Sequence, residues 1–165
     1  MMVQALRQVG IAHGDLQHGN VLVSRGKLVL IDYDGMFVPS LVGFDGHEVG
    51  HPAYQHPRRS PADFSLHMDR FAALAIYVAI RAVSLRPDLW QQLNNGDNIL
   101  FRRDDFLYPT RSLVFATLRT LPDQELVKRV MALQVACANP LSQVPDVEYA
   151  VVSSNLPEWV IQWQY

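Results

Sequence analysis

The sequence predicts a mainly α-helical fold with one small β-hairpin, an α+β class built around a central buried helix at about residues 67–84. The run from Phe71 to Ile80 is apolar on nearly every helical face, which is typical of a helix inside a core. Two β-branched runs, residues 21–23 and 28–31, flank a glycine-containing turn and predict the hairpin. Residues 32–65 are rich in Gly, Pro, His and Asp without apolar periodicity, and a loop of that length is usually functional.

The N-terminal elements follow from spacing. Val3, Leu6 and Val9 recur every three residues and predict a helix that ends at Gly10. The stretch Ser24–Lys27 is expected to form the hairpin loop, because it contains glycine and lies between the two β-branched runs.

The C-terminal half reads as further helices separated by turns. A turn is expected at residues 94–98, and helices are expected over 112–120 and 123–138, the second capped by Asp123. The charged run 102–105 is interpreted as a solvated cluster.

The chain ends in a tail, residues 141–165, to which no element is assigned. Its aromatic residues Trp159, Trp163 and Tyr165 are expected to dock back onto the domain rather than to form a partner surface. The single cysteine, Cys137, is expected to be a small buried side chain, and it excludes an internal disulfide framework.

Composition narrows the class of protein further. Of 165 residues 49% are hydrophobic and 18% charged, which excludes a disordered chain and suits one domain. The net charge of −2 disfavours a broad surface for nucleic acid or anionic membrane, so neither is expected as a partner. The sequence has no evident signal peptide and no apolar run long enough to span a bilayer, and we expect a soluble, cytoplasmic protein.

Chemistry is concentrated in His13-Gly-Asp-Leu-Gln-His-Gly-Asn20 and, after the hairpin, Asp32-Tyr-Asp-Gly35. Because a hairpin returns the chain to where it began, Asp15, Asn20 and Asp32 can converge at one rim. Oxygen-bearing side chains of this kind are the ligands that Mg²⁺ prefers. Phosphoryl transfer needs such metal ligands together with one acidic group that accepts the proton of the attacking hydroxyl.

These residues resemble the C-terminal lobe of the protein-kinase-like superfamily, in its bacterial-type form with a His-Gly-Asp catalytic loop. The loop motif is His13-Gly-Asp-Leu-x-x-x-Asn20, and Asp32-Tyr-Asp is similar to the Asp-Phe-Gly metal motif. Gly50-His-Pro-Ala-Tyr-Gln-His-Pro57 resembles the end of an activation segment, and Asp69-Arg-Phe-Ala-Ala-Leu-Ala resembles the start of the long buried helix. The four motifs occur in the family's order between Ile11 and Arg81.

The resemblance implies roles for these residues. The catalytic residues would be Asp15, which accepts the substrate proton, His13, which packs the loop against the Asp32 strand, and Asn20. Asn20 and Asp32 would bind Mg²⁺ and, through it, ATP, and Asp69 would accept hydrogen bonds from the catalytic-loop backbone. The implied activity is that of an ATP-dependent protein kinase of the Ser/Thr type, which transfers the γ-phosphate to a protein hydroxyl.

By the same resemblance the chain is a single lobe without the N-terminal ATP-binding lobe. It contains neither a Gly-x-Gly-x-x-Gly loop nor a Val-Ala-x-Lys strand. We therefore expect it to be inactive by itself and to need the missing N-terminal lobe or a partner chain. The expected parts of the lobe, residues 1–165, are the catalytic loop 13–20, the metal motif 32–35, an activation-segment-like loop 36–57, a helical subdomain 67–140 and the tail 141–165.

Four positions depart from the pattern of protein kinases. Gln17 stands in the place of a lysine that would meet the transferred phosphate, and Gly14 in the place of an arginine. Asp34 replaces a glycine and could be a second metal ligand or a cap. Arg58 replaces a glutamate, so the family's usual Glu–Arg ion pair cannot form in that orientation.

The sequence leaves other functions open. A pseudokinase-like binding or scaffold module would explain Gln17 and the incomplete nucleotide site. A small-molecule kinase of the aminoglycoside or choline kinase type would explain Gly14. A metal-dependent hydrolase built on the histidines is a third alternative, although neither His13 and His18 nor His47, His51 and His56 has the spacing of a transition-metal site, so solvated or packed histidines are the default.

Overall fold

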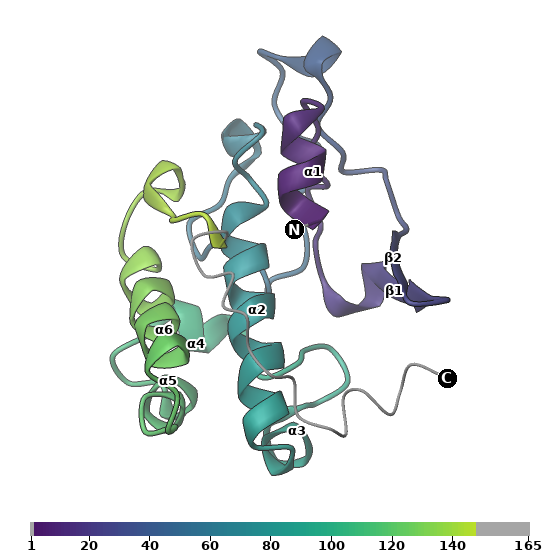
Figure 1. Cartoon of the computed structure of the whole chain (residues 1–165). Coiled ribbons are helices and arrows are strands. Elements are labelled where there is room, and N and C mark those ends of the chain that lie inside the picture. The colour runs from purple at the N-terminus through teal and green to yellow at the C-terminus, as the bar shows by residue number, and fades with distance from the viewer. Residues whose placement is uncertain (1, 148–165) are drawn as a thin grey trace.

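The structure is a computed structural model, and it describes residues 2–147. These residues form a mainly helical fold with one two-stranded antiparallel hairpin, as the sequence predicts. In Figure 1 the longest helix, α2, runs through the centre, with α4, α5 and α6 on one side and α1 and the hairpin on the other. The helices and strands are α1 (Met2–Gln8), β1 (Val21–Ser24), β2 (Lys27–Leu30), α2 (Arg70–Leu85), α3 (Asp88–Leu93), α4 (Arg103–Leu107), α5 (Leu113–Leu118) and α6 (Gln124–Ala136).

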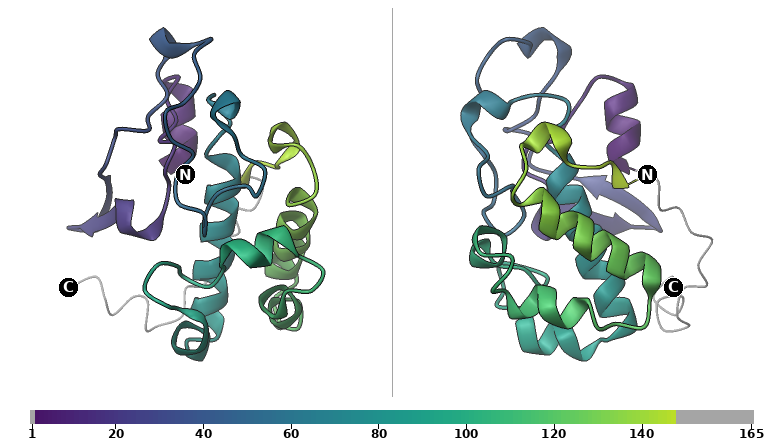
Figure 2. Two further views of the ribbon diagram at one scale, coloured as in Figure 1. Left: turned by 180° about the vertical axis from the view of Figure 1, so that it is seen from behind. Right: turned by 90° about the vertical axis from the view of Figure 1, so that its left-hand side faces the viewer.

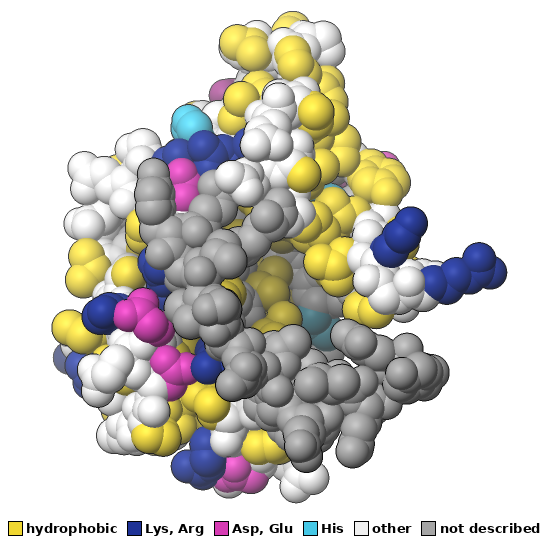
Figure 3. Space-filling model, viewed as in Figure 1, with side chains coloured by type: hydrophobic (Ala, Val, Ile, Leu, Met, Phe, Trp, Pro, Cys, Tyr) yellow, Lys and Arg dark blue, Asp and Glu magenta, His cyan; other side chains and the backbone are white. Residues whose placement is uncertain are grey.

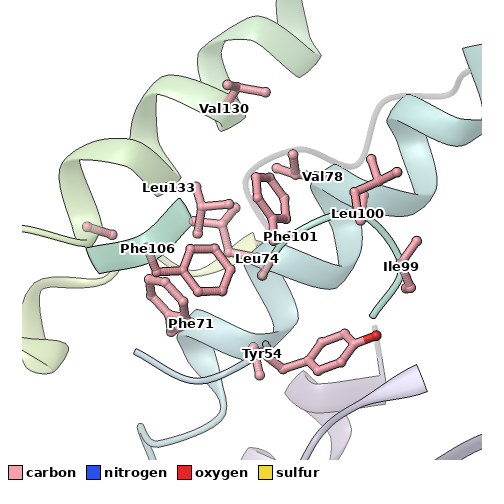
Figure 4. Close-up of a cluster of buried hydrophobic side chains, with 14 of the residues drawn as sticks. Tyr54, Phe71, Leu74, Val78, Ile99, Leu100, Phe101, Phe106, Val130 and Leu133 are labelled. Atoms are coloured by element: carbon pink, nitrogen blue, oxygen red, sulfur yellow. The ribbon is translucent and has the colours of Figure 1, made fainter. Parts of the chain in front are cut away.

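Helix α2 is the centre of the main hydrophobic core. Phe71, Leu74 and Val78 on this helix are fully buried, and Figure 4 shows them surrounded by apolar side chains of the neighbouring segments. The Phe71 ring packs edge-to-face against Phe106 of α4, with centroids 4.9 Å apart. The helix begins at Arg70, later than the expected start at about 67, and Asp69 in the capping position makes no side-chain cap.

The C-terminal helices are capped by their own side chains. Asp123 accepts a hydrogen bond from the Leu126 backbone N–H (3.0 Å), which confirms the predicted N-cap of α6. Helices α3 and α4 are absent from the sequence prediction. Residues 102–104 are exposed, in agreement with the interpretation of 102–105 as a solvated cluster, and the half-buried Asp105 accepts a hydrogen bond from the Arg102 N–H (2.8 Å) at the start of α4.

The hairpin has a tighter turn than the sequence predicts. Ser24 pairs directly with Lys27, so the turn has two residues, Arg25 and Gly26, rather than the expected stretch 24–27. Both turn residues have positive φ, 50° and 71°, which is the geometry of a type I′ turn and matches the twist of the strands. Apolar side chains on both strands are exposed, with Val23 at 75%, and Figure 3 shows basic side chains at the projecting end.

The long segment between hairpin and α2 contains only short 3-10 turns, at Pro39–Leu41 and Pro61–Asp63. It is fastened to the chain before the hairpin by a bridge in which Ala12 and Phe37 exchange both backbone hydrogen bonds (3.1 and 2.8 Å). Ala12, Phe37 and Met68 form a second, smaller core. Figure 2 shows from two further sides how this segment loops beside α1 before it enters α2.

The end of the described chain is pinned to the N-terminal half. Asp146 forms ion pairs with Arg7 of α1 and with Arg70 of α2, and Val147 is buried. The predicted docking of Trp159, Trp163 and Tyr165 lies outside the described residues.

Two further predictions concern burial and membranes. Cys137 is buried as expected, and burial raises the pKa of its thiol to about 12. Helix α2, with 16 residues, is the longest in the described part of the chain, and no helix there reaches the length and hydrophobicity of a bilayer span.

Candidate functional site

The loop 13–20 begins with a backbone turn that requires glycine at position 14. Gly14 has φ +87°, in the left-handed region, and a Cβ built there would lie 2.1 Å from the Gly35 carbonyl oxygen. The turn therefore has no room for an arginine side chain at this position, which accounts physically for the His-Gly-Asp form of the motif.

The Asp69 carboxylate fixes this turn by accepting hydrogen bonds from its backbone. Its carboxylate accepts the backbone N–H of His13 at Oδ2 (2.6 Å) and that of Gly14 at Oδ1 (2.8 Å), so the predicted contact with the catalytic-loop backbone is confirmed. Asp69 is 1% exposed, and this burial raises the pKa of its carboxyl, while the two N–H donors act in the opposite direction. Because the carboxylate is used here, it cannot cap α2.

His13 joins the loop to the end of the hairpin. The buried ring lies with Nε2 3.0 Å from the Ile31 carbonyl oxygen, and the Ile31 N–H donates to the Asn20 carbonyl (3.1 Å). Residue 31 is therefore bonded to both ends of the loop motif, and Asp32 follows it directly. Asp32 is exposed with φ +64°, and Asp34 is exposed as well. The structure thus brings the Asp32 backbone next to the loop.

Three N–H donors converge on the Asp15 carboxylate. Oδ2 accepts from Gln17 Nε2 (2.7 Å) and from Asn20 Nδ2 (3.1 Å), and Oδ1 accepts from the His51 backbone N–H (2.6 Å). Asn20 Nδ2 also donates to the Asp15 carbonyl (2.9 Å). Each carboxylate oxygen offers two acceptor positions. Among the donors of residues 2–147, two fill the acceptor positions of Oδ2 and one binds Oδ1, which leaves one position on Oδ1.

The segment that resembles an activation segment packs directly on this loop. Gly50 has φ +73°, and a Cβ there would lie 2.7 Å from Asp15 Oδ1 and 2.8 Å from the Gly14 carbonyl oxygen. Glycine at position 50 therefore allows the segment to come close enough for the His51 N–H to reach Asp15.

Two contacts of the same segment were missed by the sequence analysis. Gln55 Nε2 (3.4 Å) and Arg59 Nη1 (2.7 Å) both donate to the Gly14 carbonyl. Gln55 lies within the motif Gly50–Pro57, so its position was a possible signal, whereas nothing in the spacing of Arg59 distinguishes it from Arg58.

The far end of the segment is anchored on the C-terminus of α6. The His56 ring lies with Nε2 3.0 Å from the Ala136 carbonyl, and the Arg58 guanidinium donates to the Ala138 carbonyl. A cation beside the last carbonyls of a helix is favourable. Arg58, which excludes the usual Glu–Arg pair, thus makes an anchor of a different kind.

An aromatic pair supports the middle of the loop. The Tyr54 hydroxyl lies 2.6 Å from His18 Nδ1, and the two rings are 5.6 Å apart. Burial raises the pKa of the Tyr54 hydroxyl, so it stays protonated at neutral pH.

Asp15 opens onto a hollow of about 710 Å³. Its other walls come from the catalytic loop and from the segment 47–61, and they carry polar and charged side chains: Gln17, His47, Glu48, His51, Arg59 and Ser60. The group that could accept a proton therefore faces a space large enough for an incoming side chain.

The oxygens expected to bind Mg²⁺ are free of other partners. Within residues 2–147, neither the Asn20 side-chain oxygen nor the Asp32 carboxylate accepts a hydrogen bond. A carboxylate and an amide oxygen suit Mg²⁺, so the residues fit the ion. In the same part of the chain no three His, Cys, Asp or Glu side chains lie close enough to form a metal cluster.

Comparison with known proteins gives no assignment. No protein-family model matches the chain, and no curated protein matches it.

Proposed function

We propose that the chain is the catalytic-loop lobe of a protein-kinase-like phosphotransferase, which transfers the γ-phosphate of ATP to a protein hydroxyl. The observation that carries the proposal is the Asp15 carboxylate, oriented by three N–H donors and facing a polar hollow with one acceptor position free. Positioning of this kind is most of what a protein contributes to phosphoryl transfer.

The free position on Oδ1 supports Asp15 as the proton acceptor. The hydroxyl of the acceptor protein donates to Asp15 Oδ1 from the hollow, and its oxygen attacks the γ-phosphorus. As the new P–O bond forms, the bond to the β-phosphate oxygen breaks, ADP leaves, and the hydroxyl proton passes to Asp15. Gln17 and Asn20 keep the carboxylate from rotating during this step, because both donate to Oδ2.

Asn20 and Asp32 are the residues that would hold Mg²⁺. The ion supplies charge neutralisation at the phosphate oxygens. His13 contributes to this arrangement through the Ile31 carbonyl, because that contact fixes the backbone immediately before Asp32.

The nucleotide needs further protein surface, which we propose is an N-terminal lobe or a partner chain that packs on the hairpin. Both strands expose apolar side chains there, among them Leu22, Val23, Leu28 and Val29. An isolated two-stranded hairpin is stable only when it packs against something else, and exposed apolar surface of this kind often marks an interface.

The test is transfer of ³²P from γ-labelled ATP with Mg²⁺. Two preparations are compared, the 165-residue chain and the gene product with any in-frame upstream coding sequence included. We expect transfer by the second, near-background transfer by the first, and a loss of about 10²- to 10⁴-fold in Asp15→Asn, the usual contribution of a general base.

The matched control is Asp45→Asn, which removes an exposed carboxylate of the loop 36–57 that has no hydrogen-bond partner in residues 2–147. It should leave transfer unchanged. Transfer that survives Asp15→Asn, or its absence from both preparations, would contradict the proposal.

A binding or scaffold module without catalysis is a second candidate, and Gln17 favours it. The Gln17 side-chain amide is neutral, so it supplies no positive charge to a transferred phosphate, and it donates its hydrogen bond to Asp15 instead. Under this alternative, calorimetry of both preparations with Mg²⁺ and ATP should show no saturable heat. Tight Mg²⁺-dependent binding of ATP would exclude it.

A further inference from the structure

Arg59 lies under the catalytic loop and is bonded to its backbone. Nη1 donates to the Gly14 carbonyl (2.7 Å) and to the Gln55 side-chain oxygen, and Nη2 lies 3.3 Å from Met68 Sδ. Gly14 is therefore held at both ends, its N–H by the Asp69 carboxylate and its C=O by the Arg59 guanidinium. Two side chains of opposite charge fix a single residue.

This contact matters because of which peptide group it holds. The carbonyl of Gly14 belongs to the planar peptide that leads into Asp15, and glycine has no side chain that would restrict the rotation about its Cα–C bond that turns this peptide. The N–H of Asp15 has only a long contact, 3.4 Å to His13 Nδ1. The orientation of this peptide, and hence the direction in which the Asp15 side chain leaves the backbone, depends chiefly on the donors to the Gly14 carbonyl.

The same segment also holds the other end of Asp15. His51, whose N–H binds Oδ1, and Arg59 both belong to the segment 50–59. If this segment moved away, Asp15 Oδ1 would lose the His51 N–H, and the peptide before Asp15 would lose the donors to its carbonyl at the same time, while Gln17 and Asn20 would still donate to Oδ2. Burial lowers the pKa of the Arg59 guanidinium, and the nearby carboxylates of Asp69 and Asp15 act in the opposite direction, so they offset part of the cost of burying this charge.

We propose that Arg59 is a positioning residue that couples the packing of segment 50–59 to the orientation of Asp15. The role of Asp15 as a base rests on the proposed function, whereas the coupling is a property of the folded chain and can be measured without any substrate.

The test is hydrogen exchange of single backbone amides by NMR on the 165-residue chain. The reporter is the His51 amide, which is protected only while it donates to Asp15 Oδ1. In Arg59→Gln we expect it to exchange about 10- to 100-fold faster, the factor carried by one hydrogen bond to a charged group. The amides of α2, such as that of Val78, should keep their protection, because the opening is local.

Two further variants decide between positioning and general destabilisation. Arg103→Gln removes the same charge from an exposed position and should leave the His51 amide as in the wild type. Arg59→Lys keeps the charge and one donor, and it should restore part of the protection.

Each other outcome would overturn the proposal. An unchanged His51 amide in Arg59→Gln would mean that Arg59 does not act on Asp15. Equal acceleration of the His51 and α2 amides would mean that Arg59 only stabilises the fold. If Arg59→Gln does not fold, the same comparison in Arg59→Lys decides, with selective acceleration at His51 supporting the proposal and uniform acceleration refuting it.

Discussion

Replacing Gly14 by alanine tests whether the close approach of Gly35 constrains the loop 13–20. The new Cβ would lie 2.1 Å from the Gly35 carbonyl oxygen and 2.9 Å from Met68 Cε. Contacts of a real Cβ below 3.0 Å essentially never occur, so the Gly35 backbone would have to retreat by about 0.9 Å (3.0 − 2.1). That backbone cannot retreat freely, because the neighbouring Ala12–Phe37 bridge fixes it.

The expected cost has two parts. Placing a non-glycine residue at φ +87° costs about 1–2 kcal/mol. Overpacking against a fixed neighbour typically costs a further 1–3 kcal/mol or so. Gly14→Ala should therefore lower the free energy of unfolding by about 2–5 kcal/mol, which is a large part of the roughly 5–15 kcal/mol that holds a domain folded.

The assay is equilibrium unfolding in urea, followed by tryptophan fluorescence and circular dichroism. The matched control is Gly26→Ala, because Gly26 has a similar φ of +71° but nothing within 4 Å of the new Cβ. It should lose only the 1–2 kcal/mol or so of backbone strain. Equal losses in the two variants would refute the conclusion that the Gly35 contact constrains the loop.

Three further variants test other parts of the structure. Asp69→Ala leaves two buried backbone N–H groups without a partner, and about 3–6 kcal/mol of stability should be lost, measured by urea unfolding. Asp123→Ala removes the cap of α6 and should cost about 1–2 kcal/mol in the same measurement. Burial lowers the pKa of His56 below 6.5, so the unfolded chain binds this proton more readily than the folded chain. The free energy of unfolding should therefore fall as the pH decreases below 6.5. His56→Gln should reduce this dependence of stability on pH.

Each of these variants has a control substitution that keeps part of the contact or removes the same residue type from an exposed position. Asp69→Asn retains one acceptor and should lose less than Asp69→Ala. Asp123→Ser keeps a capping oxygen but loses the ion pair with Arg81 (2.7 Å), as Asp123→Ala does, so it should lose less than Asp123→Ala by the contribution of the cap. His47→Gln, which removes an exposed histidine, is the control for the number of histidines. Each proposed contact is contradicted by one result. For Asp69 it is an Asp69→Ala variant as stable as the wild type, and for the cap it is a loss of less than about 0.3 kcal/mol of unfolding free energy in Asp123→Ala. For His56 it is an unchanged dependence of stability on pH in His56→Gln.

The elements with strong local patterns were predictable. The apolar run around Leu74 predicts α2, and the β-branched runs predict the hairpin, because each pattern repeats within one element. Helices α3 and α4 were missed because they have six and five residues, too few to show periodicity. The two-residue turn was missed because Arg25 takes a positive φ that is uncommon for arginine.

The contacts of the candidate site could be predicted only where the residue type of a side chain indicates the interaction that it makes. The interaction of Asp69 with the loop followed from the family resemblance, since Asp69 lies 55 residues from Gly14 and no local pattern connects them. The donor at Oδ1 of Asp15 could not be predicted, because it is the backbone N–H of His51, and a backbone group leaves no trace in residue type. Arg59 was missed for a related reason, as its partner is a carbonyl oxygen.

The exposed turn of the hairpin has a consequence for how much length variation the chain tolerates. Surface turns usually accept insertions. In this hairpin both faces are largely exposed, so burial of one face does not set the strand register, and the turn at Arg25 and Gly26 sets it instead. One extra residue there would shift Ile31 along the ladder, take its carbonyl away from His13 and turn Asp32 to the opposite face. A deletion or insertion scan should therefore find this distal turn as intolerant as the catalytic loop.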